Sequence, residues 1–398
     1  MLYLGIDQHH RQITVSLRDD CGSVILRRQV STQPEKVRVF FRQLCEQAGA
    51  GGFMAILEVC GFNDWLIRML GEFGCREVVL IHPDKRSKRK TDRRDAANLS
   101  EMLWINGERL LNGQKPQGIR RVCIPSTDEQ ADRQLTSLRK RIGSQRTRTI
   151  NKVKNILRRH NLSWDQPTKT FQTQGVRKWL KELELSEMDR LEMNHLLSQW
   201  TLWDEQLKEL EQRIAERFVQ SETAQQLSTA PGVSAYSGLT LACRIGNIDR
   251  FASPRSLSNY FGLTPGCRNS GEATDRLGSI TKEGSGMARF ILGQLVLHVL
   301  KKDPWMREWY RKLRRRRGSK IARVAVMRRL VTVFWHMLKH HEDYIVGGPP
   351  RLRHRPDRST RPSRRSGSPR KKETTVKERP VKELTTNKPT VPERPVMS

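Results

Sequence analysis

The sequence predicts an α/β N-terminal domain, an all-α remainder and a disordered basic tail. Over the first part of the chain, to about residue 110, short apolar strands alternate with amphipathic helices. From about residue 125 the strand signals disappear and long helical periods replace them. Beyond Gly347 the chain carries 9 of its 18 prolines and almost no large apolar residues. A segment of that composition cannot bury a core, so we expect it to be disordered.

Charge is the dominant feature of the composition. The chain has 398 residues, enough for roughly two or three domains. Lysine and arginine number 74 against 42 acidic residues, which gives a formal net charge of +32. Such an imbalance is typical of proteins that bind a polyanion. No apolar run approaches the ~20 residues of a spanning helix, and the start MLYLGIDQHH is not typical of a signal peptide.

Seven cysteines are scattered along the chain, and none forms a CxxC pair. An odd, unpatterned set argues against a disulfide framework and favours the reducing cytoplasm. No histidine accompanies a cysteine at the spacing of zinc ligands, so no zinc site is expected. We expect each cysteine to be a small buried apolar side chain.

The N-terminal strands and helices follow one another closely. LYLGID is a strand that contains Asp7, and FMAILEVCG is a buried strand that carries Glu58 near its end. A hairpin over 13–30 turns at residues 20–22. The remaining elements expected are helices over 34–49 and 64–74, a strand over 76–83, and a helix over 92–104. The basic run KRSKRKTDRRDA, at 85–96, follows that strand and leads into the last of these helices.

Two long helices are predicted in the middle of the chain. Residues 127–162 form one basic helix, with an apolar stripe that begins at Leu135, Leu138 and Ile142 and continues at Val153 and Leu157. The second helix has apolar residues at alternating spacings of four and three: Leu196, Trp200, Trp203, Leu207, Leu210 and Ile214. That heptad spacing predicts a coiled coil or a tight helical hairpin. The seam could pack within its own chain or against another subunit.

The last folded part is predicted to be helical. Residues 227–246 indicate a helix, a PGV hairpin at 231–233 and a second helix, a helix-hairpin-helix-like segment. Such a hairpin can present backbone N–H groups to phosphates, or it can be an ordinary packing unit. The stretch 266–284 is a loop rich in Gly, Ser and basic residues without a core pattern. An amphipathic helix over 324–339 closes the folded part.

Four acidic residues stand out by their position. Asp7 and Glu58 lie at strand ends, and Asp92 and Asp95 share one face at a helix start. Strand-end acids with a helical acid pair are how ribonuclease-H-like folds build a site for Mg²⁺ or Mn²⁺. Each also has a structural alternative: Asp7 could cap a turn, Glu58 could be a surface acid, and the helical pair could cap the helix.

The residues that surround these acids resemble a known family. GID at 5–7, LEVCG at 57–61 and KTDRRDA at 90–96 are similar to the motifs of the DEDD insertion-sequence transposases. In the second half, PGVS at 231–234, the stretch 245–271 and GSITKEG at 278–284 resemble the same family. The resemblance covers nearly all of residues 1–345. Ser234 and Gly238 depart from the residues usual in the family.

The family resemblance implies a domain organisation and a site. It implies that Asp7, Glu58, Asp92 and Asp95 are the four acids of the motif and hold Mg²⁺ or Mn²⁺. The domains expected are a RuvC-like DEDD domain at 1–110, a helical coiled-coil region at 111–222, a transposase domain at 223–346 and the tail at 347–398.

The resemblance also implies an activity. Family members are bridge-RNA-guided recombinases in which the serine of an SG pair makes a phosphoserine link to DNA. That position is Ser270 here, which from the residues alone reads as a loop hydroxyl. The resemblance further implies a homo-oligomer, either a dimer or a tetramer, in which the acids of one subunit meet the serine of another.

Nucleic acid, both donor and target DNA and a structured guide RNA, is the partner that the resemblance implies. The basic helix offers a charged track for a phosphate backbone, and no zinc finger or persuasive base-reading helix is present. The residues expected to bind nucleic acid are Lys85, Arg86, Lys88, Arg89, Lys90, Arg139, Arg148, Lys152, Arg158, Gly232, Arg268 and Lys282.

Two other functions remain open from the sequence. A metal-dependent nuclease that cuts branched DNA by water attack would need only the four acids. A basic packaging protein would need neither the acids nor a metal, and would tolerate Asp92→Ala. A covalent protein–DNA adduct distinguishes the recombinase from the nuclease.

Overall fold

The fold is described from a computed structural model, over residues 1–82, 92–267 and 277–346. The tail expected to be disordered, residues 83–91 with the first part of the basic run, and the Ser270 loop at 268–276 lie outside the described residues. In sequence order the elements are β1 (Leu2–Gln8), β2 (Gln12–Arg18), β3 (Val24–Ser31), α1 (Pro34–Ala48), η1 (Gly49–Gly51), β4 (Phe53–Glu58), α2 (Asp64–Glu72), β5 (Val78–Ile81), α3 (Asp92–Leu111), β6 (Arg121–Val122), α4 (Thr127–Arg159), α5 (Gln174–Glu182), α6 (Glu187–Val219), α7 (Glu222–Ser228), α8 (Ala235–Ile245), η2 (Ile248–Arg250), α9 (Pro254–Tyr260), β7 (Pro265–Cys267), β8 (Leu277–Ile280), α10 (Gly286–Lys302) and α11 (Pro304–His340).

The N-terminal domain is built on one mixed sheet with strand order β3-β2-β1-β4-β5-β6. Strands β1, β4 and β5 are parallel neighbours, whereas β2, β3 and β6 pair antiparallel. The order 3-2-1-4-5 is that of ribonuclease-H-like folds, so the predicted fold class is confirmed. The edge strand β6 has only two residues and was not predicted.

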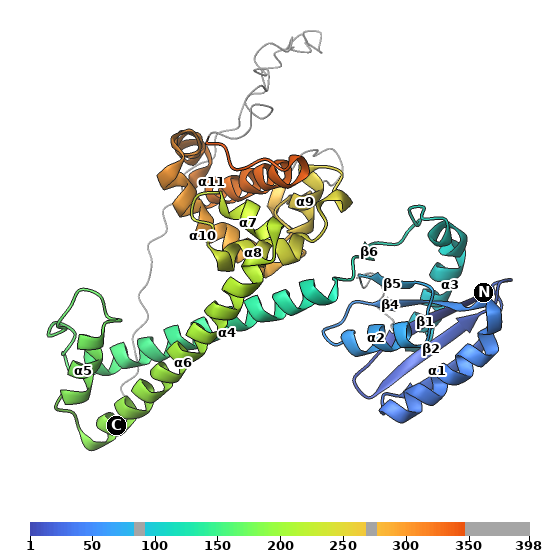
Figure 1. Cartoon of the computed structure of the whole chain (residues 1–398), viewed down its shortest axis with the longest axis horizontal. Coiled ribbons are helices and arrows are strands. Elements are labelled where there is room, and N and C mark those ends of the chain that lie inside the picture. Colours follow the sequence, from blue (N-terminus) through green and yellow to red (C-terminus); the bar gives the residue numbers. More distant parts are fainter. Residues whose placement is uncertain (83–91, 268–276, 347–398) are drawn as a thin grey trace, which may run out of the picture. The chain divides into compact units, whose positions relative to one another are not determined.

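Helices cover both faces of this sheet, and each face has its own apolar core (Figure 1). On one face, α1 contributes Val37, Phe40, Phe41 and Leu44, the four positions that its helical period predicts. On the other face, α3 packs Leu99, Leu103 and Leu110 against Tyr3, Met54, Ile56, Val79 and Ile81. Because side chains alternate along a strand, residues two apart lie on the same face. That alternation determines which acids of the sheet lie beneath α3.

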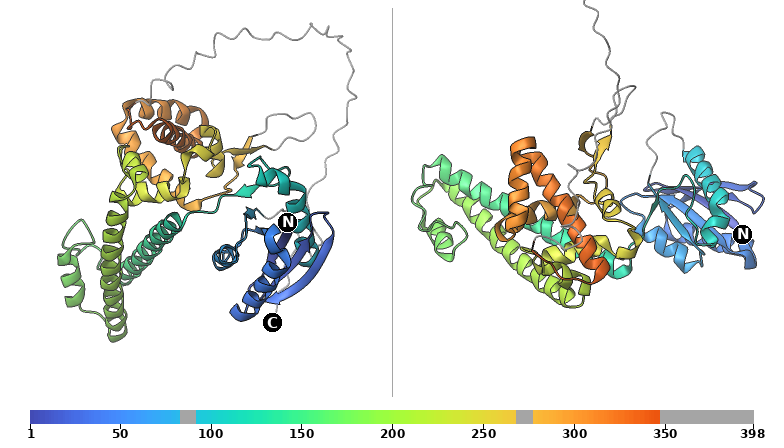
Figure 2. Two further views of the ribbon diagram at one scale, coloured as in Figure 1. Left: turned by 45° about the vertical axis from the view of Figure 1, so that its right-hand side comes forward. Right: turned by 90° about the horizontal axis from the view of Figure 1, so that it is seen from above.

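The two long helices α4 and α6 form an antiparallel hairpin within one chain (Figure 2). Trp200 is fully buried against Val153 and Leu157 of α4, and the Trp203 indole donates to Thr149 Oγ1 at 3.2 Å. The heptad seam therefore packs against its own chain. Of the two possibilities, packing within the chain and packing against another subunit, the structure shows the first.

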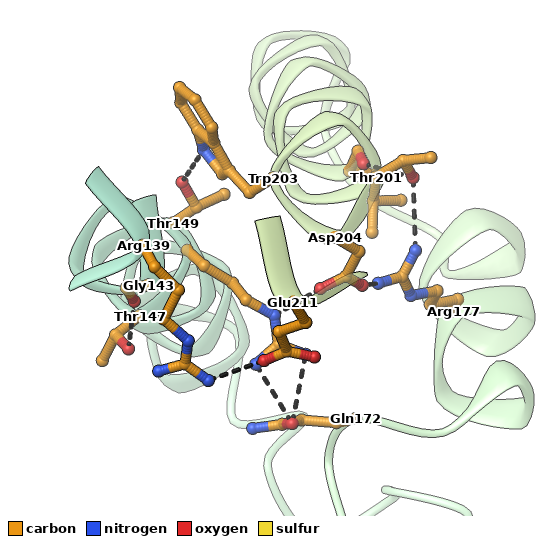
Figure 3. A network of polar contacts seen from close by, with 12 residues as sticks. Arg139, Gly143, Thr147, Thr149, Gln172, Arg177, Thr201, Trp203, Asp204 and Glu211 are labelled. Atoms are coloured by element: carbon orange, nitrogen blue, oxygen red, sulfur yellow. Dashed lines mark hydrogen bonds and ion pairs between the residues drawn. The ribbon is translucent and has the colours of Figure 1, made fainter. Parts of the chain in front are cut away.

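Polar contacts fix the register of this hairpin (Figure 3). The Asp204 carboxylate lies between two guanidinium groups, those of Arg146 on α4 and Arg177 on α5. Arg146 also donates from two nitrogens to Gln172 Oε1 at 3.1 Å. Asp204 on α6 thus joins α4 and α5. These contacts select one register among those that the apolar seam alone would allow.

Replacing Asp204 with Ala is expected to destabilise the hairpin by roughly 1–2 kcal/mol, because two partly exposed guanidinium groups lose their shared acceptor. Urea unfolding followed by tryptophan fluorescence measures this, since Trp200 lies under Arg177. Glu205→Ala, on the exposed face beside it, is the control and should change stability by less than about 0.5 kcal/mol. Equal losses in the two variants would contradict the register role of Asp204.

The C-terminal part is helical, as predicted, with α7 to α11 around a common core. α11 is interrupted at Gly318, whose φ of 80° and ψ of 165° are accessible essentially to glycine alone. Strands β7 and β8 pair antiparallel and were not predicted. They bring the two ends of the Ser270 loop together.

The cysteine prediction is partly wrong. The six cysteines whose side chains are described are free thiols, but Cys21 and Cys123 are exposed and only Cys243 is fully buried. Burial raises the pKa of the Cys75 thiol to about 12, so that thiol stays protonated. Within the described residues, none of the helices has the length and apolarity needed to cross a bilayer.

Candidate active site

Asp7 and Glu58 come together at the carboxyl end of two neighbouring parallel strands. The register pairs Ile6 with Leu57, so the next residue of each strand lies beside the other. Both acids lie two residues beyond positions that face α3: Gly5 in β1 and Ile56 in β4. Their carboxylates therefore lie on the α3 face of the sheet. The strand-end positions predicted from the sequence produce this pairing.

Helix α3 brings Asp95 to the same edge. Tyr3 lies against Gly107, whereas Gly5 lies against Ala96 and Ser100, so α3 runs antiparallel to β1. The next position of β1 on this face is Asp7, which therefore lies beside the first turn of α3, where Asp95 is half-buried. Asp92 begins the helix, but its side chain is not among those described.

Close packing of α3 on β1 depends on the absence of a side chain at Gly5. A Cβ there would lie 2.4 Å from the Ala96 carbonyl oxygen and 2.4 Å from the Ser100 nitrogen. Both are backbone atoms of α3, so the steric overlap could be relieved only by moving the helix. The glycine of the GID motif thus sets the distance between the strand acids and the helix acids.

Gly5→Ala is therefore expected to displace α3, at a cost of roughly 1–3 kcal/mol in stability and with loss of the metal-dependent strand cleavage that the family resemblance implies. Thermal unfolding and a strand-cleavage assay measure the two effects. Gly71→Ala is the matched control, because nothing lies within 4 Å of its added Cβ. A Gly5→Ala protein with unchanged stability and activity would contradict this account of the packing.

Neighbouring polar residues hold the strand ends in place. The Asn63 amide donates to Gln8 Oε1 at 2.9 Å and to the Glu58 carbonyl oxygen at 3.0 Å. Asn63 Oδ1 accepts from the Cys60 N–H at 2.5 Å. His9 Nε2 lies 3.1 Å from Asp7 Oδ2. Sequence reasoning missed Asn63 and Gln8, because no pattern in the chain links residues that far apart.

A buried hydroxyl lies next to Asp7. Thr14 is the cross-strand partner of Asp7 in β2 and is 2% exposed. Among the described residues, its Oγ1 has no hydrogen-bond partner. Facing strand residues share a side of the sheet, so the Thr14 hydroxyl adds a polar atom beside Asp7. We refer to the end of the sheet that carries Asp7, Glu58 and Asp95 as the acid edge. In the sequence, only the position of Thr14 in the strand that pairs with that of Asp7 could have indicated that it lies at this site.

The donor set at this edge suits a hard divalent cation. Asp7, Glu58 and Asp95 offer carboxylate oxygens, the ligands that Mg²⁺ and Mn²⁺ prefer. The ligand atoms of these three acids are not all within 4.8 Å of one another. Among the described residues, only Asp19, Asp20 and Cys21 have three ligand atoms that close together. Those three lie in the exposed β2–β3 turn, where Asp19 Oδ1 accepts from Ser23 N at 2.7 Å. That contact explains Asp19 as a turn residue.

The expected nucleic-acid-binding residues lie in different settings. Arg148, Lys152 and Arg158 are exposed on α4. Arg139 differs from them, because its guanidinium donates to Glu211 Oε1 at 2.7 Å (Figure 3). The same guanidinium also lies over the ring of Tyr236. Arg139 thus belongs to the contacts within the chain. Lys85, Arg86, Lys88, Arg89, Lys90 and Arg268 lie outside the described residues.

The PGV hairpin forms despite its two departures from the family. Gly232 has φ of 82°, and a Cβ there would lie 2.2 Å from the Cβ of His298. Ser234 caps α8, because its hydroxyl accepts from the Ser237 N–H while Ser237 Oγ accepts from the Ser234 N–H. Gly238 packs against Ala224, where a Cβ would lie 2.8 Å from the carbonyl oxygen. The hairpin is therefore tight, and Gly232 is exposed at its tip.

The serine loop has a firm base. Pro265 pairs with Ile280 across β7 and β8. Just outside these strands, a Cβ on Gly262 would lie 1.9 Å from the Glu283 carbonyl oxygen, and one on Gly284 would lie 1.9 Å from that of Tyr260. Two backbone segments cross there in direct contact. Lys282 is exposed beside this crossing.

Comparisons with known proteins agree with these motifs. The chain matches the transposase family DEDD_Tnp_IS110 over residues 4–162 and the transposase IS116/IS110/IS902 family over residues 224–311. It is 27% identical over 310 residues to the transposase for insertion sequence element IS1111A of Coxiella burnetii, covering 73% of this chain and 79% of that protein. It is 26% identical over 358 residues to a probable family 20 transposase of Pseudomonas aeruginosa, covering 86% and 98%. To the transposase for insertion sequence element IS1328 of Yersinia enterocolitica it is 22% identical over 337 residues, covering 83% and 95%.

Proposed function

This chain belongs to the IS110/IS116 family of transposases, and from that premise we propose that it exchanges DNA strands through a covalent serine intermediate under the direction of a structured RNA. The observation that supports metal-dependent strand chemistry is the acid edge, whereas the serine step and the guide RNA rest on the family resemblance. Asp7 and Glu58 on adjacent parallel strands, and Asp95 in the first turn of α3, are family motif residues that the fold places at one edge of the sheet.

The acids Asp7, Glu58, Asp92 and Asp95 are proposed to hold Mg²⁺ or Mn²⁺. When bound, such a cation would stabilise the negative charge on a phosphate oxygen and lower the barrier to displacement of a strand end at that phosphate. The chain's own contribution is to position these carboxylates. Gly5 sets how close α3 approaches, and Asn63 fixes the end of β4. Electrostatically, adjacent carboxylates are tolerable next to a phosphate only when a cation compensates them.

Ser270 is proposed as the nucleophile. Its oxygen forms a bond to the phosphorus of one DNA strand while the bond to the departing strand breaks. The departing hydroxyl takes up the proton that the serine loses, which keeps the step balanced. In the second step the free hydroxyl of another strand attacks the phosphoserine, and the serine regains a proton. The paired strands β7 and β8 support this role, because they hold the two ends of the loop at a fixed base.

Target choice is proposed to come from a guide RNA rather than from base-reading side chains. The exposed Arg148, Lys152 and Arg158 of α4 favour contact with a phosphate backbone, which carries no sequence information. We propose that the chain forms a homo-oligomer in the bacterial cytoplasm. The acids of one subunit would then meet the serine of another. Because α4 of the same chain packs along the seam of α6, we propose that another surface joins the subunits.

Recovery of the nucleic acid that copurifies with the full chain tests the guide. A discrete structured RNA that is required for strand exchange on a DNA pair matching it supports the proposal. A random mixture of nucleic acids, together with RNA-independent strand exchange, contradicts the guide and leaves the acid edge and Ser270 to be tested separately.

A further inference from the structure

The most strongly charged exposed segment of the described chain is one that the proposed function does not use. Seven of the ten residues from 311 to 320 are basic. They are Arg311, Lys312, Arg314, Arg315, Arg316, Arg317 and Lys320, and all seven are exposed. Except for Arg311, the segment also lies outside both family matches, which end at residues 162 and 311. We refer to residues 311–320 as the α11 basic segment.

The base of this segment is firmly anchored. Asp303 is fully buried and caps α11, since its Oδ1 accepts from the Met306 N–H at 3.0 Å. Arg307 donates to the carbonyl oxygens of Leu300 and Lys301 at the end of α10. The helix is therefore fixed at its start, and the basic segment follows within the next turns, up to and just past the break at Gly318. Figure 1 shows α11 changing direction part-way along its length, at the break that Gly318 introduces.

Helix stability alone does not account for so many cations. Basic residues in the last turn before Gly318 interact favourably with the helix dipole, by about 0.3–1 kcal/mol each near the terminus. That explains one or two arginines, but the like charges of seven neighbours repel one another. Among the described residues, a single carboxylate, that of Glu308, lies within 4.0 Å of a cation of this segment, Lys312. The charge is thus largely uncompensated within the chain and suits an external polyanion.

The arrangement of the charges indicates which polyanion. At 3.6 residues per turn, basic residues at 311, 312, 314, 315, 316 and 317 point in every direction around the helix. A strand lying along one side would meet only a part of them. A helix about 10–12 Å in diameter fits the major groove of B-DNA, about 12 Å wide, with phosphates on both sides. The major groove of duplex RNA is too narrow to admit it.

We propose that the α11 basic segment inserts into the major groove of duplex DNA and binds the phosphates of both groove walls. It is a DNA-docking element separate from the acid edge and from Ser270. The proposal rests on DNA being the substrate of the proposed function, but it requires no catalytic step. A failure of the strand-exchange mechanism would therefore leave the binding test below unaffected.

The test measures binding of the full chain to a DNA duplex of about 30 base pairs, roughly three helical turns, over a range of salt concentrations. One variant replaces four cations by glutamine, whose helix propensity is similar to that of arginine: Arg314→Gln, Arg315→Gln, Arg316→Gln and Arg317→Gln. The control variant removes the same charge from exposed sites on α5 and α6: Lys178→Gln, Lys181→Gln, Lys208→Gln and Arg213→Gln. Circular dichroism confirms that both variants remain folded.

The arginine variant is expected to lose at least about tenfold in duplex affinity at moderate salt, and its log–log salt slope should fall by about 3–4, at roughly 0.9 per lost phosphate contact. The control should change the slope by less than about one. Equal losses in the two variants would show a bulk charge effect and overturn the proposal. A larger loss for single-stranded or duplex RNA of the same length than for the DNA duplex would also overturn it.

Discussion

Replacing Ser270 with Ala is expected to abolish strand joining and the covalent DNA link, while DNA binding stays within about twofold of that of the unaltered chain. The hydroxyl is the atom that would bond to phosphorus, and no side-chain oxygen remains at position 270 to replace it. Binding should persist because the phosphate contacts proposed for the exposed cations of α4 and α11 do not involve the serine. Strand-transfer products on denaturing gels and a parallel binding titration measure the two quantities.

Ser279→Ala is the matched control for this change. Ser279 is exposed in β8, close along the chain to the same loop, but it does not occupy the motif position. It should leave strand joining within about threefold. If the Ser270→Ala protein still joined strands, or if both serine variants failed equally, the nucleophile assignment would be wrong.

Replacing Asp95 with Asn is expected to lower metal-dependent strand cleavage at least about 100-fold, since the change removes a carboxylate charge from the acid edge while preserving side-chain size. Asp7→Asn and Glu58→Gln should have similar effects, because the strand register places these two acids side by side. Removal of divalent cations by a chelator should have the effect of all three. Titration of Mn²⁺ binding by electron paramagnetic resonance gives a readout that does not depend on turnover.

Asp20→Asn is the control for the acid variants. Asp20 is exposed and belongs to the group of Asp19, Asp20 and Cys21, whose ligand atoms lie within 4.8 Å of one another. It should change neither cleavage nor Mn²⁺ affinity by more than about twofold. Loss of Mn²⁺ binding in Asp20→Asn, with retention in Asp95→Asn, would move the metal site to the β2–β3 turn.

The sheet and its acids could be predicted because their signals are local. Short apolar runs predict strands β1 to β5, and the period of α1 predicts its four buried residues. An acid at the end of each of two strands becomes a pair as soon as the strands are parallel neighbours. Position in the chain was enough to find Asp7 and Glu58.

Other parts of the site depend on contacts between distant residues, which no local pattern contains. The heptad of α6 predicted a seam but not its partner, and α4 of the same chain fills it. Arg139 was expected at the nucleic-acid surface, yet Glu211 and Tyr236 engage it. Strands as short as β6 and β7 have no period to detect.

For the α11 basic segment, the residues were visible in the sequence but their structural setting was not. Its charge was visible in the sequence from Arg311 onward, but an amphipathic helix was expected there only from Val324. The exposure of all seven cations, and the break at Gly318 beside them, emerge only from the fold.

The most direct test of the central claim is to stop the full chain on a DNA substrate with denaturant and look for a covalent protein–DNA adduct. The account predicts an adduct that requires a divalent cation, maps by peptide mass spectrometry to a phosphodiester on Ser270, and is lost in Asp95→Asn. Cleaved DNA with free phosphate ends and no adduct would contradict it, and would identify hydrolysis by water at the acid edge as the reaction.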